Sequence, residues 1–216
     1  MTPATRWPGI HPRLLSLIEQ EGLGDKRVLD VGCGWGRLAL ALAARAQQVV
    51  GLDRDGVLIA EAQRRAAAAG VGNAEFHEAD VDRADYSVHA PDLVTSHLFA
   101  SDAMLERAGA ALAPGRCVAL LAFHVDQWKE TGRVSRFAYD EARMAAVLDR
   151  AGFAVEAMEV DREERRFASV EEGLAAAVGL QDRWQADGRW YRFIAFLESG
   201  GRTLTRSHLI AKGRRR

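Results

Sequence analysis

Short apolar runs alternate with amphipathic segments along most of the chain. The apolar runs are rich in β-branched residues, which favour strands, and the segments between them have the composition of helices. This alternation is typical of an α/β fold in which a parallel sheet is covered by helices. Strands are expected at residues 27–31, 48–53, 74–77, 93–98, 117–123 and 153–160.

The segments between these runs predict helices. Residues 37–46 and 55–69 are rich in Ala, Leu and Arg, and glycines follow the second segment, as is common after a helix C-terminus. A third helix is expected to end at Gly152, because four apolar residues before it fall on one helix face. These residues, at positions i, i+3, i+4 and i+7, are Met144, Val147, Leu148 and Ala151.

The run at residues 117–123, CVALLAF, has no polar position. A strand in the middle of a parallel sheet is buried on both faces and therefore reads as continuously apolar. Pro114 and Gly115 supply a turn just before the run. We expect this strand in the middle of the sheet.

The pattern changes after residue 160. A charged stretch at residues 161–166 precedes Ser169 and Glu172, whose spacing is that of a capping box at a helix start. Residues 203–211 are expected to form a last, more polar strand at or near a sheet edge. The length suits one domain, residues 1–216, in which residues 161–200 form an insertion or lid.

Aromatic residues are concentrated between residues 184 and 196. They have two interpretations: rigid contact area over a ligand, or the buried stripe of a helix. Trp190, Ile194 and Leu197 have the spacing of a buried stripe. We therefore expect Trp190 in the core, and Trp184 and Tyr191 facing a pocket.

Charge and cysteine content exclude several classes of protein. The chain has 29 basic and 30 acidic residues, so no net field draws it to nucleic acid or to an anionic membrane, and the basic end at residues 212–216 is interpreted as a solvated tail. Cys33 and Cys117 make neither a disulfide framework nor a zinc cluster. No apolar run reaches the ~20 residues of a membrane span, and no signal peptide is recognised. We expect a cytoplasmic protein without membrane contact and without a metal site.

Residues 28–36, VLDVGCGWG, read as a strand that runs into a glycine-rich loop. A nucleotide at the end of a parallel strand needs backbone that approaches closely and adopts positive φ, and Gly32, Gly34 and Gly36 supply it. The helix expected from Arg37 directs its free N–H groups toward the same crevice. Loop and helix start together predict a nucleotide-type ligand.

Carboxylates follow the next two predicted strands. Asp53 ends the second strand, where a ribose diol lies in a nucleotide-binding sheet of this kind. Asp80 follows the third strand, where it can accept from an exocyclic adenine amine while Val81 packs on the ring. Each feature alone is often only a turn or a helix cap. Their order and spacing together favour a nucleotide-like cofactor.

The loop distinguishes between cofactors. The dinucleotide fingerprint G-x-G-x-x-G needs a third glycine at position 37, which is Arg37 here. The loop instead reads G-x-G-x-G after an acidic residue, Asp30, and in this it resembles the class I S-adenosylmethionine-dependent methyltransferases over about residues 11–160. The resemblance implies a Rossmann-like three-layer sandwich with a mostly parallel seven-stranded sheet, whose last strand is antiparallel.

The resemblance also implies roles for the motif residues. The three loop glycines lie along the methionine part of S-adenosylmethionine, and Asp30 lies near its amino group. Asp53 holds the ribose, Asp80 holds the adenine, and the segment from Ser96 to Leu98 flanks the sulfonium. S-adenosylhomocysteine is the product. The expected cofactor contacts are Asp30, Gly32, Cys33, Gly34, Gly36, Asp53, Arg54, Asp80, Val81 and Ser96.

Methyl transfer needs alignment of two reactants and exclusion of water, and a base is optional. For an O or N acceptor that loses a proton, a histidine near neutral pKa is suitable. His97 and His124 follow the fourth and fifth strands and are the catalytic candidates, with hydrogen-bonded caps as the alternative interpretation. His11, His77, His89 and His208 have less claim.

The acceptor is expected to be a small molecule. Enzymes that methylate the exocyclic amines of nucleic-acid bases resemble one another in a polar-Pro-Pro-aromatic motif, where this chain has Thr95-Ser96-His97-Leu98-Phe99. Neither cysteine has a context for base C5 chemistry. Alternatives are a methyltransferase acting on RNA or protein, an NAD-type oxidoreductase, and a noncatalytic protein that keeps the pocket. Acceptor atom and oligomeric state are not specified by the sequence.

Overall fold

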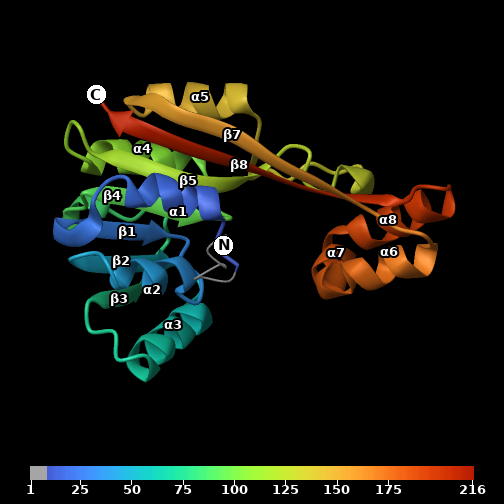
Figure 1. Cartoon of the computed structure of the whole chain (residues 1–216), viewed down its shortest axis with the longest axis horizontal. Helices are drawn as coiled ribbons and strands as arrows, with labels where there is room; N and C mark the ends of the chain where they lie inside the picture. The colour runs from blue at the N-terminus through green and yellow to red at the C-terminus, as the bar shows by residue number, and fades with distance from the viewer. Residues whose placement is uncertain (1–8) are drawn as a thin grey trace, which may run out of the picture.

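The computed structural model describes residues 9–216. Its centre is a twisted sheet in the strand order β3-β2-β1-β4-β5-β8-β7, with helices on both faces (Figure 1). The first five strands are parallel, and β8 is antiparallel to both of its neighbours, β5 and β7. The strands are β1 Arg27–Val31, β2 Gln48–Asp53, β3 Ala74–Glu78, β4 Leu93–His97, β5 Cys117–His124, β7 Phe153–Arg166 and β8 Thr203–Arg215, and the short β6, Ala138–Tyr139, pairs with β5.

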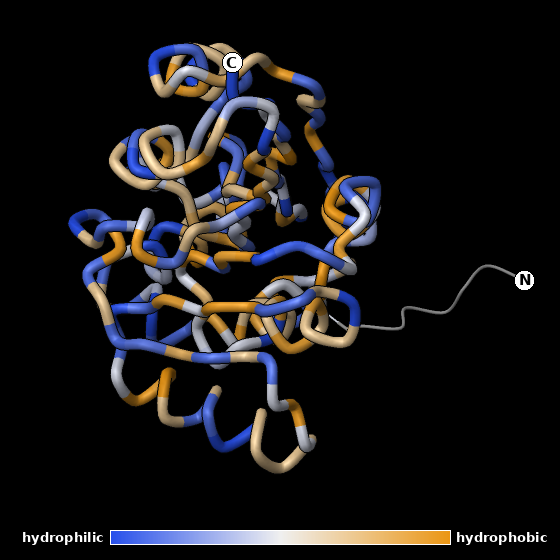
Figure 2. The backbone as a smooth tube through the Cα atoms, turned by 90° about the vertical axis from the view of Figure 1, so that its left-hand side faces the viewer, coloured by the Kyte–Doolittle hydropathy of each residue, from blue (hydrophilic) through white to orange (hydrophobic). Residues whose placement is uncertain are grey.

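Two hydrophobic clusters form the layers above and below the sheet. One contains side chains of α1 Pro12–Glu19, α2 Arg37–Ala43 and α3 Gly56–Ala68, and the other contains side chains of α4 Asp102–Ala111 and α5 Glu141–Arg150. Figure 2 shows hydrophobic stretches gathered along the strands in the middle of the molecule. The predicted three-layer α/β sandwich with a mostly parallel sheet and an antiparallel last strand is confirmed. Within residues 9–216 the sheet has eight strands and not seven, because the short β6 also pairs with β5.

Strand β5 is continuously apolar over residues 117–123 because both of its faces are buried. Leu121 packs in the first cluster and its neighbour Leu120 in the second, and both side chains are fully buried. Because successive side chains of a strand point to opposite faces, a strand covered on both sides has no place for a polar residue. The predicted central position of this strand, between β4 and β8, is confirmed.

The two C-terminal strands differ from the prediction in length and in their pairing. β8 lies next to the edge strand β7, which agrees with a position at or near an edge, but it is paired on both sides. The polar residues of β8 are buried with partners: Thr205 Oγ1 bonds Glu130, and Lys212 Nζ bonds the carbonyl oxygen of Leu17 at 3.2 Å. β7 continues to Arg166 because its charged side chains stay exposed while its backbone pairs with β8.

Three helices between β7 and β8 have a small core of their own. They are α6 Val170–Ala177, α7 Gln181–Asp187 and α8 Arg189–Glu198, and they stand at the far end of the long β7–β8 ribbon (Figure 1). Ser169 Oγ accepts from the backbone N–H of Glu172 at 3.2 Å, as the capping-box spacing predicts. We refer to α6–α8 as the helical unit.

The aromatic residues of the helical unit are buried or exposed in a different distribution from the predicted one. Trp190 is buried as expected, but Trp184 is fully buried too, packed edge-on against Trp128 and Phe193. Tyr191 is 64% exposed. The prediction that Trp184 faces a pocket is wrong because its ring fills the core of the helical unit.

Candidate functional site

The loop after β1 has the backbone conformation that its glycines allow. Gly32, Gly34 and Gly36 have φ of 68°, 54° and 80°, which L-residues with a side chain rarely adopt. A Cβ atom at Gly32 would lie 2.9 Å from Phe99 Cγ, and one at Gly36 would lie 2.9 Å from Phe76 Cε1. Within residues 9–216, no atom beyond Gly34 and its two chain neighbours lies within 4 Å of the same position at Gly34. Gly32 and Gly36 therefore fit close packing, and Gly34 adjoins open space.

Strand β2 holds this loop in place. The N–H groups of Gly32 and Cys33 donate to the carbonyl oxygen of Leu52 at 2.8 and 3.0 Å. The N–H of Gly34 donates to Asp53 Oδ2 at 2.8 Å, and Asp53 Oδ1 accepts from the N–H of Asp55 at 3.0 Å. A carboxylate offers about four lone-pair positions, so Asp53 keeps acceptor capacity for two further hydroxyl groups.

Asp30 lies beneath the loop with one oxygen unsatisfied. Its Oδ2 accepts from the N–H of Ala39 in the first turn of α2 at 3.0 Å, while Oδ1 is buried without a partner among residues 9–216. Burial raises the pKa of Asp30 to about 8. An orphaned buried carboxylate oxygen matches the ammonium group of an amino-acid ligand, which would supply both a donor and a compensating charge.

Two cavities contain most of the predicted cofactor contacts. A cavity of about 540 Å³ is lined by Gly32, Asp53, Arg54, Asp80 and Val81, among others. A smaller one of about 110 Å³ is lined by Asp30, Gly32, Cys33 and Gly34. Gly32 belongs to both cavities, so they meet at the first glycine of the loop. A ligand with an adenosine part and an amino-acid part fits this division.

Two predicted contacts lie outside these cavities. Ser96 is fully buried, and its Oγ lies 2.7 Å from the carbonyl oxygen of Val31 and 2.9 Å from that of Phe99. It links the end of β4 to β1 and to the chain that follows. Gly36 stands at the start of α2, where it lets the helix pack on Phe76.

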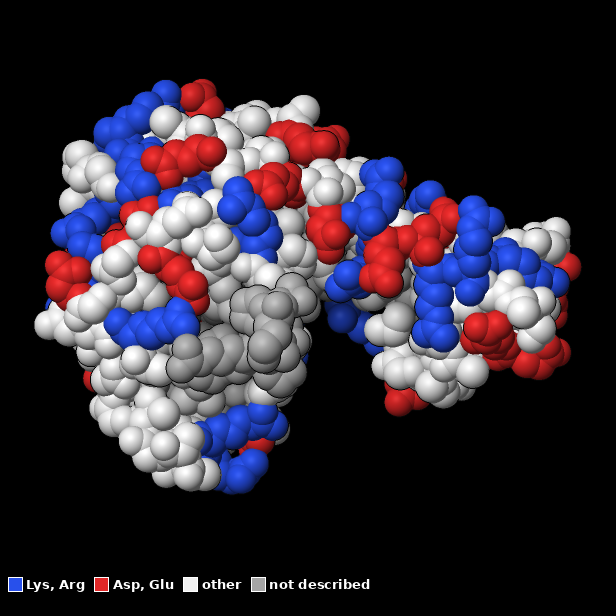
Figure 3. All heavy atoms as spheres, in the orientation of Figure 1, with Lys and Arg blue, Asp and Glu red and all other residues white. Residues whose placement is uncertain are grey.

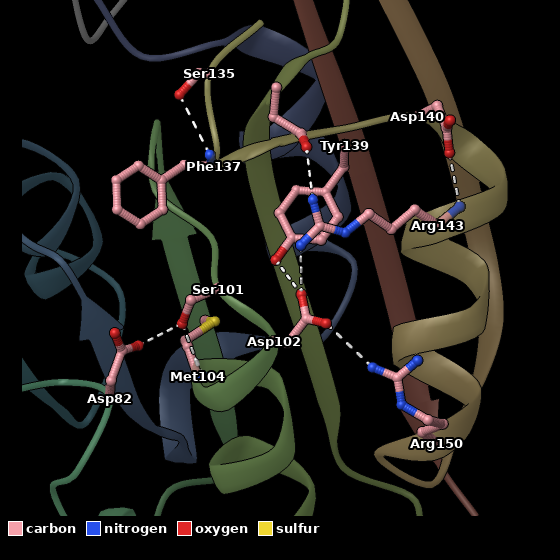
Figure 4. A network of polar contacts seen from close by, with 11 residues as sticks. Asp82, Ser101, Asp102, Met104, Ser135, Phe137, Tyr139, Asp140, Arg143 and Arg150 are labelled. Atoms are coloured by element: carbon pink, nitrogen blue, oxygen red, sulfur yellow. Dashed lines mark hydrogen bonds and ion pairs between the residues drawn. The ribbon is translucent and has the colours of Figure 1, made fainter.

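The opposite wall of the larger cavity is a polar network that the sequence did not reveal. Tyr139 OH donates to Asp102 Oδ1 at 2.7 Å, and the guanidinium groups of Arg143 and Arg150 bond the same carboxylate at 3.0 and 3.1 Å (Figure 4). Burial opposes ionisation of Asp102, but these bonds hold its pKa below the ordinary value. Ser101 donates to Asp82, which lines the same cavity (Figure 4). The contacts join residues far apart in sequence, so no local pattern signals them.

His97 ends β4 beside the loop. It lines the 110 Å³ cavity and a separate cavity of about 370 Å³. Burial lowers its pKa to about 4, with smaller contributions in the same direction from Arg37, His208 and His11. His97 is therefore a neutral imidazole near physiological pH, available as a hydrogen-bond acceptor.

His124 has different surroundings. Its side chain is buried, and its Nδ1 lies 3.0 Å from Ser207 Oγ and accepts from the N–H of Asp126 at 3.2 Å. Its Nε2 lies 3.4 Å from Glu141 Oε2. It lines none of the cavities described here. These bonds give it the surroundings of a strand-end cap, and Asp126 is paired with Arg162.

His208 was given little weight in the sequence, yet it lies at the site. It comes from β8, is 8% exposed, and lines both the 370 Å³ cavity and another of about 430 Å³. Burial lowers its pKa to about 4, with Arg206 and His11 contributing in the same direction. Its position depends on pairing between β8 and β5, which bring together residues far apart in the chain.

All four cavities meet at Leu98. This residue, just after β4, lines each of them and has a positive φ of 66°. Its N–H donates to the carbonyl oxygen of Leu121 at 2.7 Å, which fixes the turn against β5. The nucleotide-type cavities and the two further cavities thus share one junction.

The family follows from comparison with known proteins. A model of the methyltransferase domain matches residues 28–115, which include the glycine loop, Asp53 and Asp80. Residues 28–115 therefore belong to a methyltransferase domain of the class I S-adenosylmethionine-dependent type. The methyl donor of this family is S-adenosylmethionine, and the orphaned oxygen of Asp30 together with the free acceptor capacity of Asp53 fits its amino group and ribose.

Individual relatives cover parts of the chain. An uncharacterized methyltransferase of Mycobacterium bovis is 30% identical over 126 residues, 53% of this chain and 64% of its own. The 23S rRNA uracil-C5 methyltransferase RlmD of Methylococcus capsulatus is 46% identical over 59 residues, 27% of this chain and 13% of its own. The chain thus spans less than two thirds of the length of either relative.

The fold has close counterparts among solved structures. The YcgJ protein of Bacillus subtilis superimposes with a TM-score of 0.73 at 16% identity, over 95% of this chain and 99% of that one. At this identity the similarity concerns the fold alone. In residues 9–216, no helix has the length and apolar character that crossing a membrane requires.

Proposed function

We propose that the protein transfers the methyl group of S-adenosylmethionine, by in-line displacement, to an O, N or S atom of a small-molecule acceptor. The observation that carries this proposal is the junction at Leu98, where cavities suited to the donor meet cavities suited to a second reactant. An in-line displacement needs the two reactants held end to end with water excluded. A shared junction between two binding spaces supports that arrangement.

The donor-binding residues follow from the site. Asp30 accepts from the amino group, Asp53 from the ribose hydroxyls and Asp80 from the adenine amine, while Val81 packs on the ring. Gly32 and Gly34 leave room for the methionine part, Cys33 lines the cavity for that part, and Arg54 lines the larger cavity for the adenosine part. When bound, S-adenosylmethionine supplies a methyl carbon activated by the adjacent sulfonium. The protein contributes alignment, and a proton acceptor where the nucleophile carries a proton.

The cavity sizes support a small acceptor. The spaces beyond Leu98 measure about 430 and 370 Å³, within the range of roughly 300–1,000 Å³ typical of small-molecule pockets. The helical unit lines the larger one through Ala176, Leu180 and Arg183. We therefore infer that residues 161–200 form an acceptor-side lid on a single domain.

The two histidines predicted from sequence are not equivalent candidates. His97 lines the donor and acceptor sides and has a neutral imidazole, so it borders the path of the methyl group. His124 is committed to Ser207 and Asp126. We retain His97 as the candidate at the donor and assign His124 a structural role.

Methylation of RNA is the alternative that one comparison favours, because RlmD acts on 23S rRNA. The matched stretch is 59 residues long and covers 13% of that protein. Base C5 chemistry needs a reactive thiolate, but burial raises the pKa of Cys117 to about 12 and also raises that of Cys33. Acidic and basic side chains are interspersed over the face seen in Figure 3, which favours a small acceptor over RNA. No comparable observation favours a protein acceptor.

The proposal is tested by ligand binding and by turnover. Thermal unfolding is measured with S-adenosylmethionine, S-adenosylhomocysteine and NAD, because a ligand that binds only the folded state raises its stability. Both sulfur compounds are expected to raise the melting temperature, and NAD is not. Formation of S-adenosylhomocysteine is then followed with small phenols, amines and thiols, and with RNA transcripts. Stabilisation by NAD alone, or turnover with RNA alone, contradicts the proposal.

A further inference from the structure

The cavity of about 430 Å³ lies between the main body and the helical unit. Figure 3 shows a notch between these two parts of the molecule, with Lys and Arg side chains at its edge. Leu98 and Phe123 line the cavity from the body, Leu180 and Arg183 from the helical unit, and Arg206 and His208 from β8. Its composition determines which acceptor it suits.

The charged side chains of this cavity leave an excess of positive charge. Glu163 supplies the one carboxylate in the lining, and its charge is neutralised by Arg206, which pairs with it at 2.8 Å. Arg165 and Arg183 also line it, and neither forms an ion pair within residues 9–216. Two guanidinium groups without a paired carboxylate favour an anion, above all a carboxylate or phosphate that they can bind bidentately.

The floor of the cavity is aromatic. The ring of His208 lies 6.0 Å from that of Phe123, and Phe123 lies 5.8 Å from Trp128, measured between centroids. All three residues line the cavity, as Leu98 does, and together they form a row of rings. Tilted aromatic packing of this kind suits a planar ring in the acceptor.

His208 is the polar group at the end of this row. Its Nδ1 is sealed from solvent without a hydrogen-bond partner in the described part of the chain. No protein group there bonds Nε2 either, so no partner fixes which nitrogen carries the proton. A buried, unpartnered imidazole is costly unless a ligand uses it. In this cavity it is the natural hydrogen-bond partner for an acceptor hydroxyl.

Resting on the proposed function, we propose that the acceptor is a hydroxyaryl compound with an anionic group, held by Arg165 and Arg183 and presenting its hydroxyl to His208. The hydroxyl oxygen forms a bond to the methyl carbon as the bond from sulfur to that carbon breaks, and S-adenosylhomocysteine leaves. The hydroxyl proton passes to His208 and then to solvent. The product is an aryl methyl ether. His97, on the donor side of the same junction, borders the transfer but is not the proton acceptor.

Matched pairs of compounds test the anionic group. 4-Hydroxyphenylacetate and 4-hydroxycinnamate are compared with their amides, which keep the ring and hydroxyl but lose the charge. The acids are expected to have kcat/KM at least about tenfold higher than the amides, and tandem mass spectrometry is expected to identify the ether. An equal or higher value for the amides, conversion of neither acid, or formation of a methyl ester overturns the inference.

Variants assign the residues. Arg183→Gln and Arg165→Gln are expected to lower kcat/KM for the acids at least fivefold while the amide values stay within twofold. Arg192→Gln is the matched control, since Arg192 lies exposed on the same helical unit and does not line the cavity. His208→Gln is expected to lower kcat at least tenfold for acid and amide alike and to weaken its dependence on pH. An unchanged kcat in His208→Gln contradicts its role.

Binding of S-adenosylhomocysteine distinguishes a failure of the proposed function from a failure of the inference about the acceptor. Its dissociation constant is measured by calorimetry for the wild type and every variant. It is expected to stay within twofold in Arg165→Gln, His208→Gln and Arg192→Gln, which also shows that these variants are folded. Arg183 also lines the cavity of about 540 Å³, so a weaker constant in Arg183→Gln does not count against the proposal, and the folding of that variant is checked by its melting temperature. If the wild type does not bind S-adenosylhomocysteine, the proposed function fails. If it binds and no preference for the acids is found, only the inference about the acceptor fails.

Discussion

The backbone N–H of Gly34 donates to Asp53 Oδ2 at 2.8 Å, so the glycine loop and the end of β2 form one unit. The bond uses one acceptor position of the carboxylate and fixes the direction of the rest. Gly34 and Asp53 are 19 positions apart in the sequence. A direct hydrogen bond between them holds the loop against the end of β2. Donor binding and loop geometry are therefore coupled through Asp53.

Asp53→Ala is expected to weaken S-adenosylhomocysteine binding by about 10- to 100-fold, because hydrogen bonds to a charged group contribute roughly 1.5–3 kcal/mol. The dissociation constant is measured by isothermal titration calorimetry. Asp149→Ala is the control, because its side chain is 71% exposed on α5 and pairs only with Arg216 in the described structure. An affinity that stays within twofold of the wild type in Asp53→Ala removes the ribose assignment.

Asp30 is expected to make stability depend on pH. Its pKa is raised from 3.8 to about 8 in the folded protein, so folding favours the protonated form. Its stabilising contribution is therefore fully present below about pH 4 and is lost as pH rises through about 8. Asp30→Asn keeps a neutral side chain at every pH. The wild type is expected to lose stability relative to this variant between about pH 5 and pH 8, measured by urea unfolding. A difference that is constant across this range contradicts the raised pKa.

The same carboxyl group is expected to couple donor binding to pH. An ammonium group at the orphaned Oδ1 favours the ionised form, so binding releases the proton of Asp30 below pH 8. Affinity for S-adenosylhomocysteine should then rise with pH, by up to about tenfold per unit between pH 6 and 8. Calorimetry in two buffers of different ionisation enthalpy measures the released proton directly. Asp30→Asn should bind more weakly and release none, and proton release that persists in this variant assigns the effect to another group.

Gly36→Ala is expected to destabilise the protein more than a comparable change elsewhere. Its φ of 80° costs an alanine about 1–2 kcal/mol, and the new Cβ would lie 2.9 Å from Phe76, which adds about 1–3 kcal/mol of overpacking. Gly22→Ala is the matched control, because its φ is 64° but, in the described part of the chain, no atom beyond its two chain neighbours lies within 4 Å of its Cβ position. Urea unfolding measures both. Equal losses in the two variants would mean that Phe76 moves aside freely.

The donor side of the site could be predicted from sequence because its signals are local. β1 and β2 have the predicted bounds, and their ends carry the loop and Asp53. Because β1 and β2 are parallel neighbours, their pairing alone brings these residues together, without contacts from other parts of the chain. Asp80 and Val81 come just after β3, which is parallel to β2, so they also lie at this end of the sheet and line the same cavity as Asp53.

The acceptor side depends on contacts that no short stretch specifies. His208 reaches the junction because β8 inserts between β5 and β7. The polar composition of β8 predicts a position at or near an edge, but it does not specify these two neighbours. Trp184 is fully buried because Trp128, from another part of the chain, packs against it. The bonds from Tyr139 and Arg143 to Asp102 span 37 and 41 positions. Periodicity identifies elements, but it does not specify which elements become neighbours.

His124 and His97 were equal candidates in the sequence, and stability measurements can separate them. His124→Ala removes the bonds to Ser207 Oγ and to the N–H of Asp126 and leaves these groups unsatisfied in a buried place. The expected loss is about 2–4 kcal/mol in the free energy of unfolding, while affinity for S-adenosylhomocysteine stays within twofold. His77→Ala is the control, because the side chain of His77 is 51% exposed. A variant of His124 that keeps wild-type stability but loses methyl transfer would return this residue to the catalytic site, because only a contact with the reactants would then explain the loss.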